Sequence, residues 1–102
     1  YPQSAQAFRT IVRDYPDEIG YRFYFGVSLV GAKQFTEAIP PLKHCSTQEN
    51  PYKVPALYYL GLANTGAGKF SEARIALNAY IDDPEGRAYR ENARALLKDL
   101  PK

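Results

Sequence analysis

Apolar side chains recur at helical spacings along several separate stretches of the chain. Residues 18–31 and 54–67 are two such stretches, and in the second Leu57 and Leu60 lie on one face of a helix. No stretch alternates apolar and polar residues in the way that a half-buried strand does. The pattern therefore predicts an all-α fold of about six helices. Their expected ranges are roughly 2–14, 18–31, 36–47, 54–67, 71–82 and 86–99.

The chain contains an internal repeat. Residues 22–42 and 57–77 are similar at an offset of 35, without gaps, and 8 of the 21 aligned positions are identical. A repeat length between about 20 and 50 residues is typical of stacked supersecondary units. We therefore predict repeated units of two helices each. The identical pairs include Gly26/Gly61, Phe35/Phe70 and Leu42/Leu77.

A short glycine-containing segment separates the two predicted helices of each unit, at residues 31–34 and 66–69. Glycine ends a helix readily because it adopts positive φ without steric strain. Thr36 and Ser71 follow these segments, and we expect each hydroxyl side chain to cap the next helix.

Gly26 and Gly61 fall in the middle of predicted helices. Glycine costs about 0.5–1 kcal/mol there relative to alanine. Because the same loss occurs twice at one offset, we expect a packing reason, namely that the backbone of the partner helix comes close at both positions.

These residues resemble the tetratricopeptide repeat, a helix–turn–helix unit of about 34 residues. One unit matches at Leu57, Leu60, Gly61, Phe70, Ala73, Leu77 and Tyr80. The unit before it matches at Phe25, Gly26, Leu29, Phe35, Ala38, Leu42 and Cys45. The second half of a still earlier repeat fits Tyr1, Ser4, Phe8, Ile11 and Pro16. Arg22 and Asn64 depart from the family pattern, which usually has a large apolar residue and a Tyr-like residue there.

The resemblance implies one domain over residues 1–102, a short right-handed α-solenoid of antiparallel helix pairs. Its expected parts are the second helix of a partial repeat at 1–16, repeats at 19–51 and 54–84, and a C-terminal capping helix at 85–100. Because such arrays bury their faces only against neighbouring units, weak self-association or a need for flanking repeats is also expected.

The resemblance also implies an interaction scaffold that binds a partner peptide or helix in a concave groove lined by the first helix of each unit. The expected groove residues are Phe23, Val27, Val30, Tyr58, Leu62 and Thr65. The alternative is that a further helix or repeat covers this wall. Some family members hold a terminal carboxylate with Lys and Asn at groove positions, but this chain has apolar or aromatic residues there, so an apolar partner segment is expected.

Candidate chemistry is sparse in this sequence. His44 and Cys45 are adjacent, so a helix directs them differently, and the chain has no second Cys or His to complete a metal site. Cys45 is expected to be a buried structural thiol. With no nucleophile–base pair suggested, we expect no enzyme activity, no cofactor and no metal. The alternative is that the chain is an accessory segment of a larger enzyme or assembly.

The charge of the chain does not indicate a particular class of partner. The net charge of +2 on 13 basic and 11 acidic residues is too balanced to indicate nucleic acid. An alternative partner site is a basic docking strip on the last helix, formed by Arg87, Arg90 and Arg94, which would also be the place for any nucleic-acid contact. No apolar run is long enough to span a membrane. The single cysteine slightly favours the cytoplasm and leaves the periplasm open.

Overall fold

The computed structural model describes residues 2–101, with side chains from residue 5 onward. Tyr1 and the side chain of Ser4, both matched above to a partial repeat, lie outside the described residues. The described part is 74% helical and contains no strand, which confirms the all-α prediction. Its six helices are α1 (Pro2–Asp14), α2 (Ile19–Gly31), α3 (Phe35–Ser46), α4 (Lys53–Gly66), α5 (Phe70–Asp82) and α6 (Arg90–Asp99).

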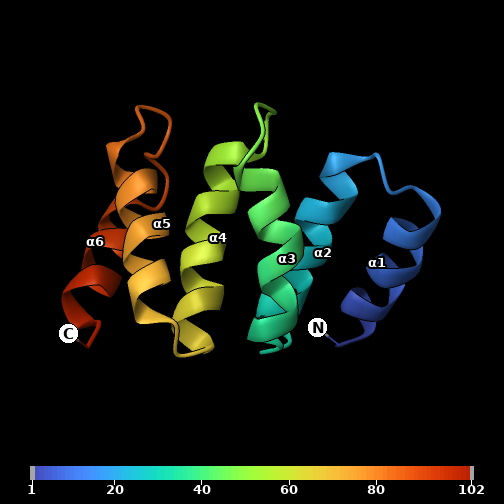
Figure 1. Cartoon of the computed structure of the whole chain (residues 1–102), viewed down its shortest axis with the longest axis horizontal. Helices are drawn as coiled ribbons and strands as arrows, with labels where there is room; N and C mark the ends of the chain where they lie inside the picture. Colours follow the sequence, from blue (N-terminus) through green and yellow to red (C-terminus); the bar gives the residue numbers. More distant parts are fainter. Residues whose placement is uncertain (1, 102) are drawn as a thin grey trace.

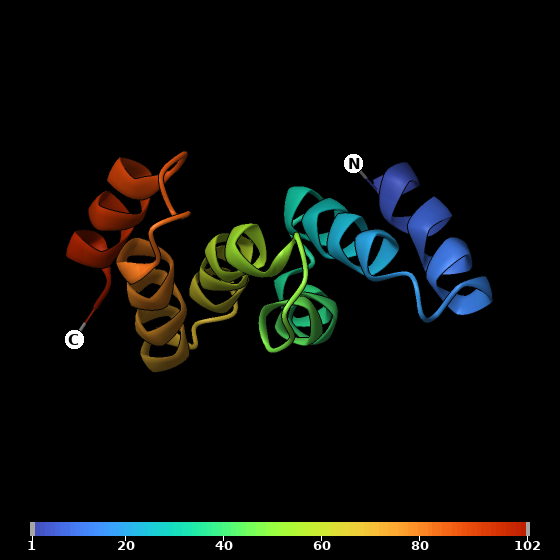
Figure 2. The same ribbon diagram turned by 90° about the horizontal axis from the view of Figure 1, so that it is seen from above.

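The helices follow one another across the molecule in the order of the sequence (Figure 1). α3 and α5 lie on one side, α2 and α6 lie on the other, and α4 stands between them (Figure 2). Each helix packs on the next one in the chain, and α2 also contacts α4. This arrangement leaves two faces: the first-helix face of α2, α4 and α6, and the second-helix face of α3 and α5.

The mid-helix glycines admit a buried leucine from the second helix of the same unit. A Cβ atom added to Gly26 would lie 2.5 Å from Cγ of Leu42, and one added to Gly61 would lie 2.5 Å from Cδ2 of Leu77. Both leucines are fully buried. The expected close approach is therefore present, but the neighbour is a leucine side chain rather than the partner backbone.

The turns inside the two units share one backbone geometry. Gly68 has φ of +78°, and Lys33, its equivalent at the repeat offset, has φ of +61° although it carries a side chain. The expected caps were wrong: α3 and α5 begin before Thr36 and Ser71. The reason is that the amide of Ala38 already donates to the Gln34 carbonyl, 3.1 Å away, so helical hydrogen bonding starts ahead of these hydroxyl residues.

The last helix begins at Arg90 rather than at residue 86 as expected. Before it, the chain turns tightly: the Gly86 amide donates to the Asp83 carbonyl at 2.9 Å, and the Glu85 amide donates to Asp83 Oδ1 at 2.9 Å. Gly86 is pressed against the carbonyl of Tyr80 so closely that no Cβ would fit. The chain is therefore held at the end of α5, and the helix can begin only after this turn.

Candidate functional site

The structure corrects the expected position of two groove residues. Phe23 and Tyr58 are each only 7% exposed and belong to the two hydrophobic cores. Tyr52 stacks on Phe23 with ring centroids 5.1 Å apart, and Tyr89 stacks on Tyr58 at 4.7 Å. These two tyrosines come from the segments before α4 and α6 and cover the predicted wall. Phe23 and Tyr58 are thus core residues and not accessible anchors.

The more accessible aromatic positions lie one residue further along each first helix. Tyr24 is 49% exposed, and Tyr59 is partly buried. One residue along a helix changes the direction of a side chain by about 100°, so this shift exchanges the buried and the open position. The groove positions expected at Phe23 and Tyr58 were therefore displaced by one residue along each helix.

The covering tyrosines could have been found from a second periodicity. Tyr15, Tyr52 and Tyr89 recur at intervals of 37 residues, each shortly before a first helix or the final helix. The comparison at an offset of 35 did not detect them, because that offset does not align residues that are 37 apart. Tyr15 packs edge-on against Tyr21, with centroids 5.9 Å apart, and remains 58% exposed.

The other expected groove residues are placed differently from one another. Val27 and Val30 are partly buried and pack against the first of the two hydrophobic cores, which includes residues of α1 to α5. The Thr65 hydroxyl donates to the Gly61 carbonyl of its own helix at 2.8 Å. Leu62 lines a cleft between α4 and α6. The structure therefore brings only Leu62 of this set, together with the edge of Tyr58, to an open cleft.

This α4–α6 cleft has an apolar floor and an acidic rim. Its volume is about 390 Å³, and it is lined by Tyr58, Leu62, Glu91, Asn92, Ala95, Leu96 and Asp99. Glu91 pairs with Arg94 across one turn of α6, with Oε1 2.8 Å from Nη1. The cleft can hold an apolar side chain beside a group that is positively charged or donates hydrogen bonds.

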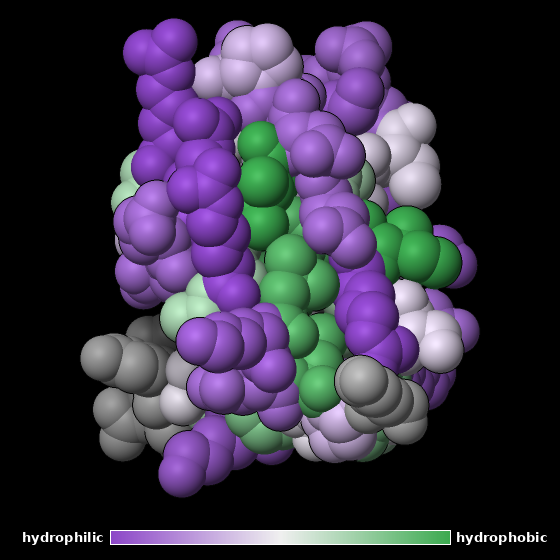
Figure 3. Space-filling view, turned by 90° about the vertical axis from the view of Figure 1, so that its left-hand side faces the viewer, coloured by the Kyte–Doolittle hydropathy of each residue, from purple (hydrophilic) through white to green (hydrophobic). Residues whose placement is uncertain are grey.

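The C-terminal end of the molecule presents a further apolar surface. Hydrophobic side chains form a strip there, with hydrophilic ones on both sides (Figure 3). Leu96, Leu97 and Leu100 of this end are only partly buried. Self-association through such a surface stays a prediction.

The three arginines of the expected basic strip do not form one stripe. Arg87 precedes α6, and its Nε donates to the Pro84 carbonyl at 3.1 Å. Arg90 is turned toward the end of α5, where it donates to the Asp83 carbonyl at 3.2 Å. Arg94 alone lies on an exposed side of the helix, paired with Glu91. The late start of α6 is the reason, because the helical spacing that aligned these residues does not hold before residue 90.

The two side chains considered above for catalysis or metal binding, Cys45 and His44, make local contacts within the fold. Cys45 is fully buried, and burial raises the pKa of its thiol to about 11, while the nearby Arg22 guanidinium acts in the opposite direction. His44 lies beside the Gln48 amide, with Nε2 3.2 Å from the amide nitrogen. Among the described residues, no group of three or more His, Cys, Asp or Glu side chains could hold a metal ion. No helix in residues 2–101 is long and apolar enough to cross a membrane.

The burial of Tyr58 leads to a testable difference between two tyrosines. We expect Tyr58→Ala to lower the free energy of unfolding by about 3–5 kcal/mol, because it removes a buried ring that contacts Tyr80 and Tyr89. Tyr24→Ala removes a half-exposed ring and should cost about 1 kcal/mol. Urea denaturation of both variants measures the difference. Equal losses would contradict the burial described here.

Comparison with known proteins adds a family match. The family model of the tetratricopeptide repeat matches residues 55–85. This range covers α4 from Pro55 onward, all of α5 and the start of the turn after it. No significant match was found among curated proteins or among solved structures. Tetratricopeptide repeats generally mediate protein–protein interaction and are typically non-catalytic. The match shows that residues 55–85 are similar to a tetratricopeptide repeat, and it supports the resemblance to this family seen in the sequence.

Proposed function

We propose that the chain is a non-catalytic interaction scaffold that binds a peptide or helix of a partner protein on its first-helix face. The observation that supports this best is the α4–α6 cleft, in which Leu62 and Leu96 form an apolar floor open to solvent. The two-helix units at 19–51 and 54–84 would serve to hold this face in shape. In this proposal, α6 has a double role, because it covers the last unit and forms one wall of the cleft.

The rim of the cleft indicates the chemistry of the partner. Glu91 and Asp99 are both exposed and stand on the same helix, eight residues apart, beside the apolar floor. An apolar side chain of the partner would fill the floor, and a lysine or arginine next to it would meet the carboxylates. Partner segments that carry an apolar residue beside a basic one therefore fit this cleft best.

A substitution that fills the cleft tests the proposal. Ala95 is exposed and lines the cleft, so Ala95→Arg places a large side chain there without removing a core residue. We expect this variant to fold normally and to weaken partner binding by about 1–2 kcal/mol or more. The measurement is affinity capture from the native extract with wild type and variant, followed by calorimetric titration of the captured partner.

Asn78→Arg is the matched control, because it adds the same charge at an exposed position of α5 outside the cleft. Binding should be weakened with Ala95→Arg and unchanged with Asn78→Arg. A partner that binds both variants as tightly as wild type would show that the cleft is not the site.

A further inference from the structure

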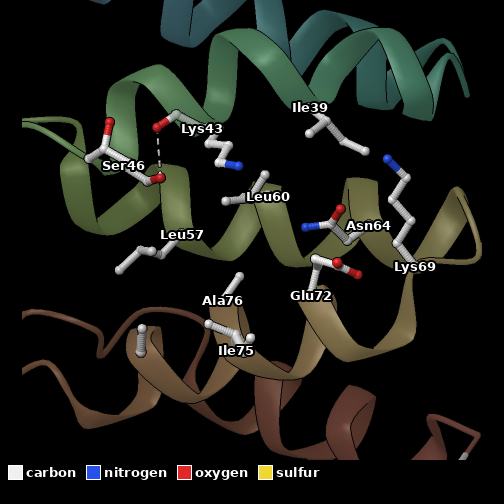
Figure 4. Close-up of a pocket in the computed structure, with 12 residues that line it drawn as sticks. Ile39, Lys43, Ser46, Leu57, Leu60, Asn64, Lys69, Glu72, Ile75 and Ala76 are labelled. Carbon is white, nitrogen blue, oxygen red and sulfur yellow. Dashed lines mark hydrogen bonds between the residues drawn. The ribbon is translucent and has the colours of Figure 1, made fainter.

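A second, separate groove crosses the opposite, second-helix face of the molecule. α3 and α5 form its walls and α4 forms its floor, and its volume is about 430 Å³ (Figure 4). Leu57 and Leu60 contribute apolar surface from the floor, and Ile75 stands on α5 with 71% of its surface exposed. Ala76 and Ala79 keep the α5 wall low, so a chain could approach the floor closely. We name this the α3–α5 groove.

One polar side chain, that of Asn64, stands on the otherwise apolar floor of this groove. Asn64 is only 4% exposed, and its amide points into the space between α3 and α5 (Figure 4). Among the described residues, no hydrogen bond joins this side chain to another group of the protein, whereas its backbone carbonyl accepts from the Lys69 amide at 2.8 Å. Its amide atoms are not among the fully buried unpaired atoms of the described residues, so they keep contact with the open space of the groove. The side chain thus offers one acceptor and two donors to whatever enters the groove.

The rim of the α3–α5 groove carries an excess of positive charge. Lys43 reaches in from α3, Lys69 reaches in from the start of α5, and Glu72 is the one carboxylate among the lining residues. Neither lysine forms a salt bridge with any described residue, although four salt bridges occur elsewhere in this part of the chain. An occupant with a negative charge would therefore gain two ammonium partners.

We propose that the α3–α5 groove binds an extended peptide segment that carries an acidic residue next to an aliphatic one. The aliphatic side chain lies on the floor beside Leu60. The carboxylate meets Lys43 and Lys69. The Asn64 amide donates to a backbone carbonyl of the segment and accepts from a backbone N–H.

The Asn64 amide also decides between an extended and a helical occupant. A helix satisfies its central backbone groups internally and has no free N–H and C=O to offer. An extended chain offers both, as in the addition of a strand to a sheet edge. This site lies on the other face from the α4–α6 cleft and does not depend on the function proposed for that cleft.

Titration with a defined peptide tests the inference. The probe is a short, end-blocked peptide of alternating aspartate and leucine, and its control has lysine in place of aspartate. In ¹H–¹⁵N correlation spectra, we expect saturable shifts of the Asn64 side-chain amide and of the Ile75 backbone amide with the acidic peptide. The basic peptide should leave both signals in place.

Variants decide whether the shifts report this site. Asn64→Leu is expected to weaken binding of the acidic peptide about fivefold, since the hydrogen-bonding amide is gone. The surface double variant Lys43→Ala, Lys69→Ala should weaken it to a similar extent, and Lys98→Ala, a matched change on α6, should not. Ala95→Arg, which blocks the other cleft, should leave peptide binding unchanged.

Several results would overturn the proposal. These are the absence of saturable shifts, equal shifts with the basic peptide, or shifts confined to Leu62 and Leu96. Undiminished binding by both the Asn64 variant and the double lysine variant would overturn it as well. Because the lysine variant changes only exposed side chains, failure of Asn64→Leu to fold would still leave a decisive measurement.

Discussion

A Gly61→Leu protein is expected to lose about 3 kcal/mol of stability, at the upper end of the range for overpacked cores. The side chain would start 2.5 Å from Cδ2 of Leu77, a residue with no exposed surface. Neither helix can retreat, because Leu77 also packs in the second core with Val54 and Tyr80. Thermal melts followed by circular dichroism measure the change.

A double-mutant cycle separates this contact from general damage to the helix. Gly61→Ala and Leu77→Ala each remove stability, the first by crowding and the second by leaving a cavity. Combined, they should cost less than the sum of the two single changes, because the added methyl group occupies space that the leucine vacated. Strict additivity would mean that the two residues do not share this space.

Removal of residues 88–102 is expected to abolish cooperative unfolding or to lower Tm by about 15 °C or more, which corresponds to a loss of about 3 kcal/mol. The deletion uncovers the ring of Tyr58, removes Ala93 from the second core and takes away Leu96, Leu97 and Leu100. The backbone amide of Tyr89 also donates to the Tyr80 hydroxyl at 2.9 Å, so a buried phenol loses its partner.

A charge variant of the intact chain is the control for this deletion. Replacing Arg87, Arg94 and Lys98 with Gln removes three exposed charges and one exposed salt bridge, which contribute little to stability. This variant should melt close to wild type, whereas the deleted chain should bind a dye specific for exposed apolar surface. A truncated chain that stays folded and monomeric in sedimentation would show that α6 does not cover the last unit.

The periodic features of the sequence predicted most of the fold. The repeat at an offset of 35 located α2 to α5 to within about one residue of their observed ends. It also identified Gly26 and Gly61 as points of close packing, because a glycine in mid-helix has a local cost that only a tertiary contact explains. These predictions succeeded since they depend on neighbours within one unit.

Features that depend on contacts between units could not be predicted in this way. Phe23 and Tyr58 are buried by Tyr52 and Tyr89, which come from connecting segments outside the repeated blocks. The α3–α5 groove was not expected, because Asn64 was noted only as a departure from the family pattern. Asn64 forms a candidate binding site only together with Lys43 and Lys69, which the fold brings to the same opening from separate elements.

The order of the helices in space has a mechanical consequence. Since neighbours in sequence are neighbours in space, no substantial interface joins α1 or α2 to α5 or α6. A force that pulls the two chain ends apart therefore loads one small interface at a time, as in the opening of a zipper. The α5–α6 interface is the smallest of the successive ones, so α6 detaches first and the others peel away in turn. Under tension the chain is therefore expected to lengthen in steps of one helix.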